Sequence, residues 1–294
     1  MELIRSLQHL VKRGSQIALL VILVIGTAFI YIPPDNKHSY QSSLIKRDQI
    51  RSIPGARIIL AGGSSLALGI DSEKMEAALG MPVINNGLHA ALGVAPLEEI
   101  RPLIHPGDII IISLEFYNFL DDVSFYGNPQ YTSDWVEIAP ERIWYLKDPL
   151  AQMPVVYTLI LQHKIKRELN YYLYGGTLDP IRNGFTADKF NSYGDFIGHL
   201  GVEYPLPIAN TPYPVRYLDA AYIYLENFNQ DAIAKGAVVF FEEQPHRQSN
   251  CDTTGVGLLR EFYLELKKIP AFLLSHRGRN SAIPMIISIT HHII

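Results

Sequence analysis

The feature that most constrains the fold of this chain is an apolar run that ends abruptly in small residues. Residues 57–61 read Arg-Ile-Ile-Leu-Ala, and two glycines and two serines follow at 62–65. A short apolar run of strand formers bounded by glycines is typical of a buried strand, and a helix start signal follows at Asp71. The stretch therefore predicts a strand, a tight turn and a helix, with a serine where the strand ends.

The same rhythm continues along the chain. Further apolar strands are predicted at 82–85, 108–114, 237–241 and 271–274, with helices at 71–79, 96–104, 215–235 and 253–268. Short, nearly all-apolar strands that alternate with amphipathic helices indicate a parallel sheet covered on both faces. We therefore expect an α/β fold with three layers, α/β/α, of the flavodoxin-like kind.

An apolar run at the N-terminus, residues 17–32, predicts a membrane-spanning helix. The run would be about 24 Å long as a helix, slightly short of a hydrocarbon core of about 30 Å, and its flanks would extend it into the interface. Arg5, Lys12 and Arg13 precede the run and no basic residue directly follows it. This asymmetry predicts a cytoplasmic N-terminus.

The predicted organisation follows from this anchor. Residues 1–36 form a cytoplasmic stub and a transmembrane signal-anchor, and residues 37–294 form a domain in the periplasm or outside the cell. The membrane is thus one expected partner. The alternative is a signal peptide cut after the small residues at 26–28.

Composition excludes several classes of function. The net charge is −4 and the basic residues form no long block, so nucleic acid is not expected as a partner. The lone cysteine, Cys251, excludes an intrachain disulfide and a multi-cysteine metal site. The ten histidines show no metal-ligand spacing, and we expect neither a metal nor another cofactor.

Two stretches interrupt the α/β rhythm. Residues 36–55 are polar and predict a linker. Residues 117–214 are rich in aromatic residues, Asn and Gly and predict an insertion or lid, with 157–174 its most helix-like part. The aromatic residues that could line a sugar or acyl groove are Trp135, Trp144, Tyr171, Tyr172 and Tyr174. Packing in a core is the alternative for them.

Polar residues follow three of the predicted strands. The first strand is followed by Gly63 and Ser64, the second ends in Asn-Asn-Gly at 85–87, and the third is followed by Glu-Phe-Tyr-Asn at 115–118. Carboxyl ends of neighbouring parallel strands meet at one edge of a sheet. We interpret Ser64 as a nucleophile, with Ser65 as the alternative, and glycine as the residue that lets N–H groups approach a substrate oxygen. Serines that only cap the next helix are the structural alternative.

These three blocks resemble the first three blocks of the SGNH/GDSL hydrolase family, in particular the membrane-anchored bacterial members whose first block reads Gly-Gly-Ser. The resemblance covers roughly residues 57–118. It implies an SGNH-type fold, Ser64 as the residue that attacks an ester carbonyl, and an oxyanion hole that contains the Ser64 backbone N–H, Gly63 and Gly87. The family's third-block asparagine is also an oxyanion donor, and its base is a histidine in a late Asp-x-x-His motif.

The third block departs from the family pattern because Glu115 falls on the asparagine. An ionised carboxylate accepts hydrogen bonds and cannot donate one to an oxyanion. Either Glu115 is protonated, or Asn118 or Asn86 takes the donor's place. Glu115 is alternatively an orienting or charge-stabilising group, or a helix cap.

The absence of the late Asp-x-x-His block is the second departure from the family pattern. His276, His291 and His292 lie in the right part of the chain, but none has an aspartate three residues before it. His246, just after a predicted strand, is the substitute candidate for the base, and an ordinary loop histidine is its alternative. A serine without a base is a weak nucleophile.

The tail suggests a reason for the missing motif. Residues 282–294 are an apolar string without turn signals. One synonymous coding of this string, read two bases later, encodes Asp-Ser-Asp-Asp-Tyr-Phe-Tyr-Asn-Thr-Pro-Tyr-His, which resembles the family's late block. We hypothesise a frameshift between about residues 272 and 282, which sequencing of the gene tests.

Two functions follow as hypotheses. The first is an envelope-facing, membrane-anchored SGNH-like serine esterase or O-acyltransferase that acts on acyl esters of a surface polysaccharide or related molecule, with the base absent or displaced in this copy. The second is a non-catalytic SGNH-like protein that binds glycan or assembles with envelope partners. A poorly folding pseudogene product is the third reading.

Overall fold

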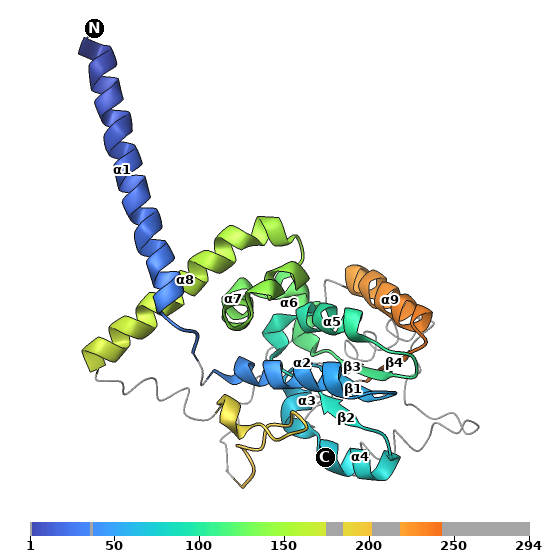
Figure 1. Cartoon of the computed structure of the whole chain (residues 1–294). Helices are drawn as coiled ribbons and strands as arrows, with labels where there is room; N and C mark the ends of the chain where they lie inside the picture. The colour runs from blue at the N-terminus through green and yellow to red at the C-terminus, as the bar shows by residue number, and fades with distance from the viewer. Residues whose placement is uncertain (1, 36–37, 175–184, 202–217, 243–294) are drawn as a thin grey trace, which may run out of the picture.

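The computed structural model describes residues 2–35, 38–174, 185–201 and 218–242, and a four-stranded sheet forms its centre (Figure 1). The strands are β1 (Ile58–Gly62), β2 (Val83–Asn85), β3 (Ile109–Ser113) and β4 (Val238–Phe241), in the order β2-β1-β3-β4. All three pairings are parallel, so the carboxyl ends of the strands lie at one edge. The predicted parallel α/β sheet is confirmed, and these four strands lie within one residue of their predicted bounds.

Different helices cover the two faces of the sheet. Alternate strand residues such as Ile59 and Ile110 pack against α2 (Ser42–Ser52), α5 (Ala95–Ile100) and α9 (Leu218–Ala234). The intervening residues, such as Ile58 and Leu60, pack against α3 (Ser64–Gly69) and α4 (Ser72–Leu79). This is the pattern expected for strands whose successive side chains point to opposite faces.

Local signals set the helix ends. The side chain of Asp71 accepts a hydrogen bond from the Lys74 N–H, and Gly80 ends α4 in the left-handed conformation at φ 65°, as in a common helix stop. The predicted helix at 96–104 is shorter, because Pro102 has no N–H to continue it. There the chain passes from α5 into the 3-10 turn η3 (Arg101–Leu103).

The polar stretch 36–55 is not a linker, which corrects the prediction. It contains η1 (Ser39–Gln41) and α2, whose inner face buries Ser42, Ser43, Lys46 and Ile50. Three of these four residues are polar. A helix that buries hydroxyls and an ammonium group gives no apolar periodicity, and this explains why the pattern did not reveal it.

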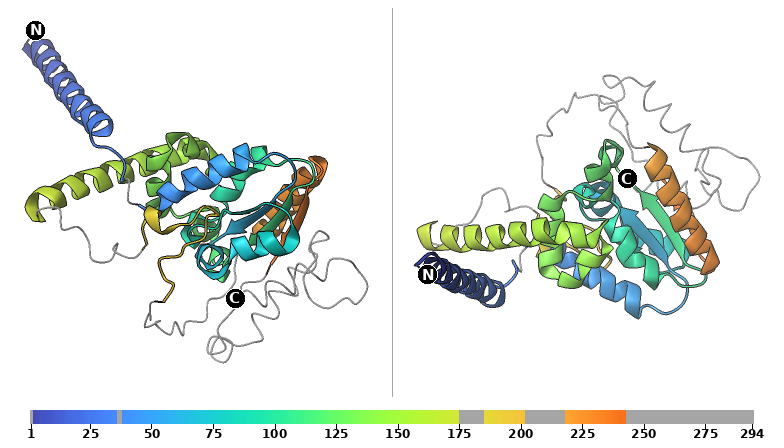
Figure 2. Two further views of the ribbon diagram at one scale, coloured as in Figure 1. Left: turned by 60° about the horizontal axis from the view of Figure 1, so that its bottom comes forward. Right: turned by 90° about the horizontal axis from the view of Figure 1, so that it is seen from above.

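The N-terminal helix α1 (Glu2–Tyr31) has 30 residues and projects from the domain (Figures 1 and 2). It is long and apolar enough to cross a membrane by length and composition. At about 45 Å, it extends the predicted 17–32 run back through the basic N-terminal stretch. The exposed apolar side chains along it include Ile17, Leu20 and Leu23.

The aromatic-rich region between β3 and β4 is helical. Its elements are η4 (Phe116–Phe119), α6 (Asp122–Tyr126), α7 (Pro129–Ile138), η5 (Pro140–Tyr145), α8 (Pro149–Tyr174) and η6 (Ala187–Lys189), and η2 (Ala90–Leu92) lies earlier, after β2. Within 117–174 and 185–201, the part described, this region forms no β-strand. α8 contains the predicted helix-like part and begins eight residues earlier. α7, η5 and α8 enclose a second apolar core around Trp135, Val156 and Ile160.

Candidate functional site

The ends of β1 and β3 approach so closely that only glycine fits between them. Gly62 pairs with Ser113, and a Cβ on Gly62 would lie 2.0 Å from the Ser113 carbonyl oxygen. A Cβ on Gly63 would lie 2.4 Å from Glu115 Oε1. Gly62 therefore lets the backbones of β1 and β3 approach at this edge, and Gly63 leaves room for the Glu115 side chain.

This approach brings two of the predicted residues into contact. Ser64, the first residue of α3, donates its hydroxyl hydrogen to Glu115 Oε1 over 3.1 Å. The Ser65 backbone N–H donates to the same oxygen over 3.3 Å. Ser64 and Glu115 are both half-buried. A hydroxyl directed at a carboxylate has an acceptor in place for its proton when the oxygen attacks an electrophile.

Glu115 also caps η4. It forms a capping box with Asn118, whose side-chain oxygen accepts from the Glu115 N–H over 2.9 Å. Helix capping and contact with Ser64 are thus combined in one residue. The cap fixes the backbone of Glu115 at the edge of the sheet and so fixes where its carboxylate can reach.

The amide donors of Asn118 are used inside the protein. The side-chain amide donates to the Ala90 carbonyl over 2.7 Å and to the Ser124 carbonyl over 3.0 Å. The residue is buried. Both amide hydrogens therefore join backbone segments, and in this geometry neither faces the Ser64 hydroxyl.

Gly87 lies beside α3, but its N–H is also used. It donates to Asn85 Oδ1 over 2.9 Å. A Cβ on Gly87 would lie 2.7 Å from the Ala67 nitrogen and from Leu66 Cβ. The structure thus brings the second loop next to the helix of Ser64, as predicted for three converging strand ends, but directs the predicted oxyanion donor at a neighbouring side chain.

Asn86 differs from Asn118 and Gly87 in that its side-chain donor is not used within the described fold. It is 2% exposed, and its side-chain Nδ2 has no hydrogen-bond partner among the residues that the structure describes. A buried amide without a partner is rare and costs about 1–3 kcal/mol. Of the predicted alternatives for the oxyanion donor, Asn86 is the one with an uncommitted side-chain donor.

A buried lysine of α2 contacts the loop that follows β2. Lys46 of α2 is fully buried and donates a hydrogen bond from Nζ to the Gly87 carbonyl. Burial lowers the pKa of Lys46 to about 7, although the charge of Asp195 opposes this shift. Lys46 was missed at the sequence level because it lies in the stretch interpreted as a linker.

His89 is a second titratable group near Glu115 that the sequence interpretation did not single out. Its Nδ1 accepts from the Ala91 N–H over 3.1 Å, and its ring stacks on Tyr131 at 4.7 Å between centroids. Burial lowers the pKa of His89, and the charge of Glu115 partly offsets this. Because Nδ1 is an acceptor, the neutral ring carries its hydrogen on Nε2. The signal that could have found it is its place two residues after Gly87.

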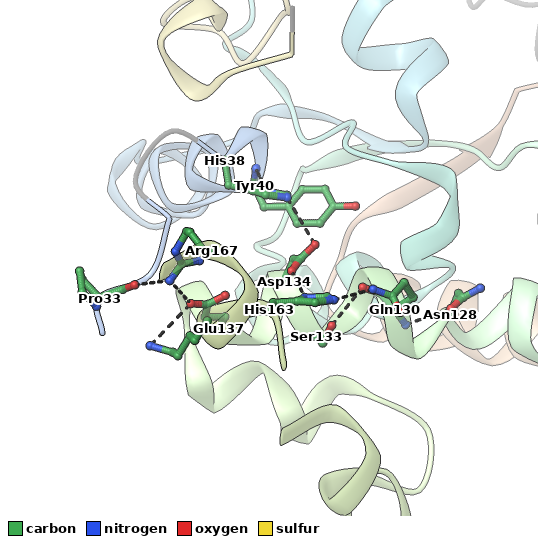
Figure 3. Close-up of polar contacts among 11 residues, drawn as sticks. Pro33, His38, Tyr40, Asn128, Gln130, Ser133, Asp134, Glu137, His163 and Arg167 are labelled. Carbon is green, nitrogen blue, oxygen red and sulfur yellow. Dashed lines mark hydrogen bonds and ion pairs between the residues drawn. The ribbon is translucent and has the colours of Figure 1, made fainter. Parts of the chain in front are cut away.

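Two further histidines share one carboxylate (Figure 3). Asp134 Oδ1 lies 2.7 Å from His163 Nδ1, and its Oδ2 lies 3.5 Å from His38 Nε2. Burial raises the pKa of Asp134, but the hydrogen bonds from the two histidines outweigh it and the net shift is downward. The other ring nitrogens contact the Tyr40 N–H and the Gln130 side chain. This cluster joins the segment after α1 to α7 and α8.

The aromatic residues divide between core and surface. Trp135 is fully buried, with the Arg142 guanidinium 4.5 Å from its ring, so it is a packing residue and not part of a groove. Trp144, Tyr171 and Tyr172 are exposed. In the part of the chain that the structure describes, no group of three or more His, Cys, Asp or Glu side chains is arranged to hold a metal ion.

His246, the predicted substitute base, lies outside the described residues, as do His276, His291, His292 and the frameshift region. These remain predictions. No family model, no curated protein and no solved structure matches this chain.

Proposed function

We propose that this chain is a membrane-anchored, envelope-facing SGNH-like serine esterase or O-acyltransferase that acts on acyl esters of a surface polysaccharide or related molecule. The observation that carries the proposal is the 3.1 Å hydrogen bond from the Ser64 hydroxyl to Glu115 at the carboxyl edge of the sheet. In open α/β sheets this edge is where ligands bind. Helices on both faces of the sheet are compatible with a three-layer SGNH-type architecture, which is part of the proposal.

The proposed reaction starts from this contact. Ser64 Oγ attacks the ester carbonyl carbon while its proton passes to Glu115. The C–O bond to the leaving alcohol then breaks, Glu115 returns the proton to that alcohol, and the acyl group stays on Ser64. Water or an acceptor hydroxyl next attacks the acyl-serine carbonyl carbon and gives its proton to Glu115. The C–O bond to Ser64 Oγ then breaks, and Glu115 returns this proton to Ser64, which restores the free serine and the carboxylate. Attack by water is hydrolysis, and attack by an acceptor hydroxyl is acyl transfer.

Two further groups belong to this proposal. The Asn86 side-chain amide is the proposed donor to the oxyanion, since the Gly87 N–H and the Asn118 amide already have partners in the fold. Donors of this kind typically contribute about 10²–10³ in rate. His246 stays a candidate base that would relay the proton in place of Glu115.

The membrane topology is the remaining part. Basic residues at the start of α1 favour a cytoplasmic N-terminus, and the domain that follows α1 would then lie on the outer side. The length and apolar composition of α1 support this anchor. No sequence pattern specifies the acyl group, so the substrate class rests on location and on the family resemblance.

A serine-directed fluorophosphonate probe tests the nucleophile. The full chain in detergent is incubated with the probe beside the Ser64→Ala and Ser65→Ala variants, and folding of each is verified by circular dichroism. We expect labelling of the wild-type chain and of Ser65→Ala, and its loss in Ser64→Ala. Folded wild-type protein that takes no label, or labelling that persists in Ser64→Ala, contradicts the proposal.

The second candidate is a non-catalytic SGNH-like protein that binds glycan or assembles with envelope partners. Its specific support is that two of the predicted oxyanion donors are occupied within the fold. Exposed aromatic rings are the usual contacts for sugars, and Trp144 is 59% exposed. This candidate predicts glycan binding that Ser64→Ala leaves unchanged and Trp144→Ala weakens. Trp135→Ala is not a useful test because it removes a core residue.

A further inference from the structure

The helix α8 has an apolar face that points away from the protein. Its inner face packs on α7 and η5 and buries Val156 and Ile160. Its outer side exposes apolar side chains, between 44% and 79% exposed, in two groups, namely Leu150 and Val155 near the start and Ile165, Leu169, Tyr172 and Leu173 near the end. The four near the end recur at a spacing of three to four residues and so lie on one side of the helix, whereas the exposed Thr158 and Gln162 separate the two groups. An exposed apolar strip of about 12 Å at the end of the helix marks an interaction surface.

The charges of α8 are distributed unevenly. The one carboxylate in the helix, Glu168, is half-buried, whereas Lys166 is exposed beside the apolar strip. Tyr172, the most exposed of the six at 79%, lies near the C-terminal end. An apolar face with a flanking lysine and an interfacial tyrosine is the composition of a helix that lies in the plane of a membrane surface.

The end of α1 is fixed to this same helix. The Lys164 ammonium donates to the Ile32 carbonyl, and the Arg167 guanidinium donates to the Pro33 carbonyl. Glu137 of α7 forms an ion pair with Arg167, drawn in Figure 3, at 3.1 Å and lies 3.6 Å from Lys164. The residues that leave α1 are thus held by the inner side of α8.

The arrangement in space agrees with these contacts. α8 runs across the end of α1 and not along it, and the sheet lies farther from α1 than α8 does (Figures 1 and 2). If α1 crosses a bilayer, the surface of that bilayer on the domain side lies at the end of α1. α8 is the element that meets this surface.

We propose that the outer face of α8 lies in the lipid–water interface of the membrane that α1 crosses. This inference rests on the proposed anchor and adds a second contact to it. The partner is the bilayer and not a second copy, because insertion of α1 brings lipid next to this face of every molecule. The apolar side chains enter the boundary between headgroups and acyl chains, and Lys166 meets the headgroups. The domain is then held in one orientation on the membrane.

Site-specific labels in the full chain test this placement. A fluorophore is attached to Leu169→Cys in a Cys251→Ser background, and the protein is reconstituted into phosphatidylcholine–phosphatidylglycerol vesicles. Quenching by spin-labelled lipid is compared with quenching by aqueous iodide. Ile223→Cys on α9, where the native side chain is 60% exposed, is the matched control on a face distant from α1. Leu20→Cys, also 60% exposed, reports on the anchor.

We expect the label at 169 to be quenched by lipid as strongly as the label at 20, and severalfold less by iodide than the label at 223. Iodide quenching at 169 equal to that at 223 overturns the proposal. Protection of 169 from both quenchers also overturns it, because a protein surface then covers the helix. If the label at 20 does not meet lipid, the anchor itself fails together with this inference. Labelling of Ser64 by the phosphonate probe is independent of all these results.

Discussion

The same two strands, β1 and β3, carry a polar pair at each end, and the two pairs differ in almost every respect. At the amino ends Arg57 and Asp108 form an ion pair of 2.8 Å, with both side chains 0% exposed. At the carboxyl ends Ser64 and Glu115 meet at 3.1 Å and are half-buried. One pair is closed off from solvent and the other lies at the rim of the sheet.

The bonding of the two pairs differs too. Asp108 accepts from the Arg57 backbone N–H, from the guanidinium and from the His105 N–H, and Arg57 also donates to the Ile50 and Leu103 carbonyls. Glu115 Oε1 accepts from one hydroxyl and one backbone N–H. The amino ends therefore hold the strands together through a buried network, whereas the carboxyl ends carry a hydroxyl and a carboxylate that are in contact and half-buried.

The largest expected effect is on the amino-end pair. Asp108→Ala leaves the Arg57 guanidinium buried without a counter-charge, and we expect the free energy of unfolding to fall by about 4 kcal/mol. Chemical denaturation of the full chain in detergent measures this. Asp48→Ala, at an exposed position of α2, is the control and should change it by about 0.5 kcal/mol or less. A loss of unfolding free energy below about 1 kcal/mol for Asp108→Ala would contradict the claim that the buried pair holds the amino ends of the strands together.

The carboxyl-end pair should respond in reactivity. Glu115→Gln keeps an oxygen that can accept from Ser64 but removes the acceptor for its proton. We expect the rate of phosphonate labelling to fall on the order of a hundredfold, with a stability change of about 1 kcal/mol or less. Glu73→Gln, on the exposed side of α4, should leave the rate unchanged. An unchanged labelling rate in Glu115→Gln would show that Glu115 caps the helix but does not accept the Ser64 proton.

A third polar contact lies after β2, where the buried Lys46 binds the Gly87 carbonyl. Its folded-state pKa is lowered to about 7, so between pH 7.5 and 9.5 the unfolded chain binds a proton that the folded chain does not. Stability should therefore rise with pH, by about 2 kcal/mol over this window. Lys46→Met should show a flatter profile, whereas Lys74→Met, exposed on α4, should keep the wild-type slope. Parallel profiles for Lys46→Met and wild type would contradict a buried, neutral lysine.

The smallest effect is expected at His89. Replacement by Asn removes the stacking on Tyr131 and should cost about 1 kcal/mol at pH 7.5. The pKa of His89 is lowered in the folded state, so the unfolded chain takes up the proton first and stability falls as pH drops below about 6.5. The difference between wild type and His89→Asn should therefore narrow at pH 5. His105→Asn, at an exposed position, is the control and should change neither the stability at pH 7.5 nor its dependence on pH. An equal loss of stability in His105→Asn would contradict a specific contribution from His89.

The four strands that the structure describes were predictable because each is a local apolar run between turn residues. The helix α2 was not, because it buries Ser42, Ser43 and Lys46. Their burial is decided by partners far along the chain, such as the Gly87 carbonyl. Polar contacts of this range leave no periodic signal in the sequence.

For the site, the sequence could predict which residues meet but not which hydrogen bonds they form. The meeting of Ser64 with Glu115 follows from parallel strand ends. The use of the Gly87 N–H by Asn85, and of the Asn118 amide by Ala90 and Ser124, does not. A donor's choice between a neighbouring side chain and a substrate depends on distances of a few tenths of an ångström, which residue types alone do not determine.

The identity of the residue that the phosphonate modifies tests the proposed role of Ser64 most directly. The wild-type full chain is labelled while folded, digested, and mapped by mass spectrometry. We expect one adduct, on Ser64, and none on Ser65. An adduct on another residue, or a Ser64 that stays unmodified in folded protein, would show that the contact between Ser64 and Glu115 is structural and that the carboxyl ends are no more reactive than the amino ends.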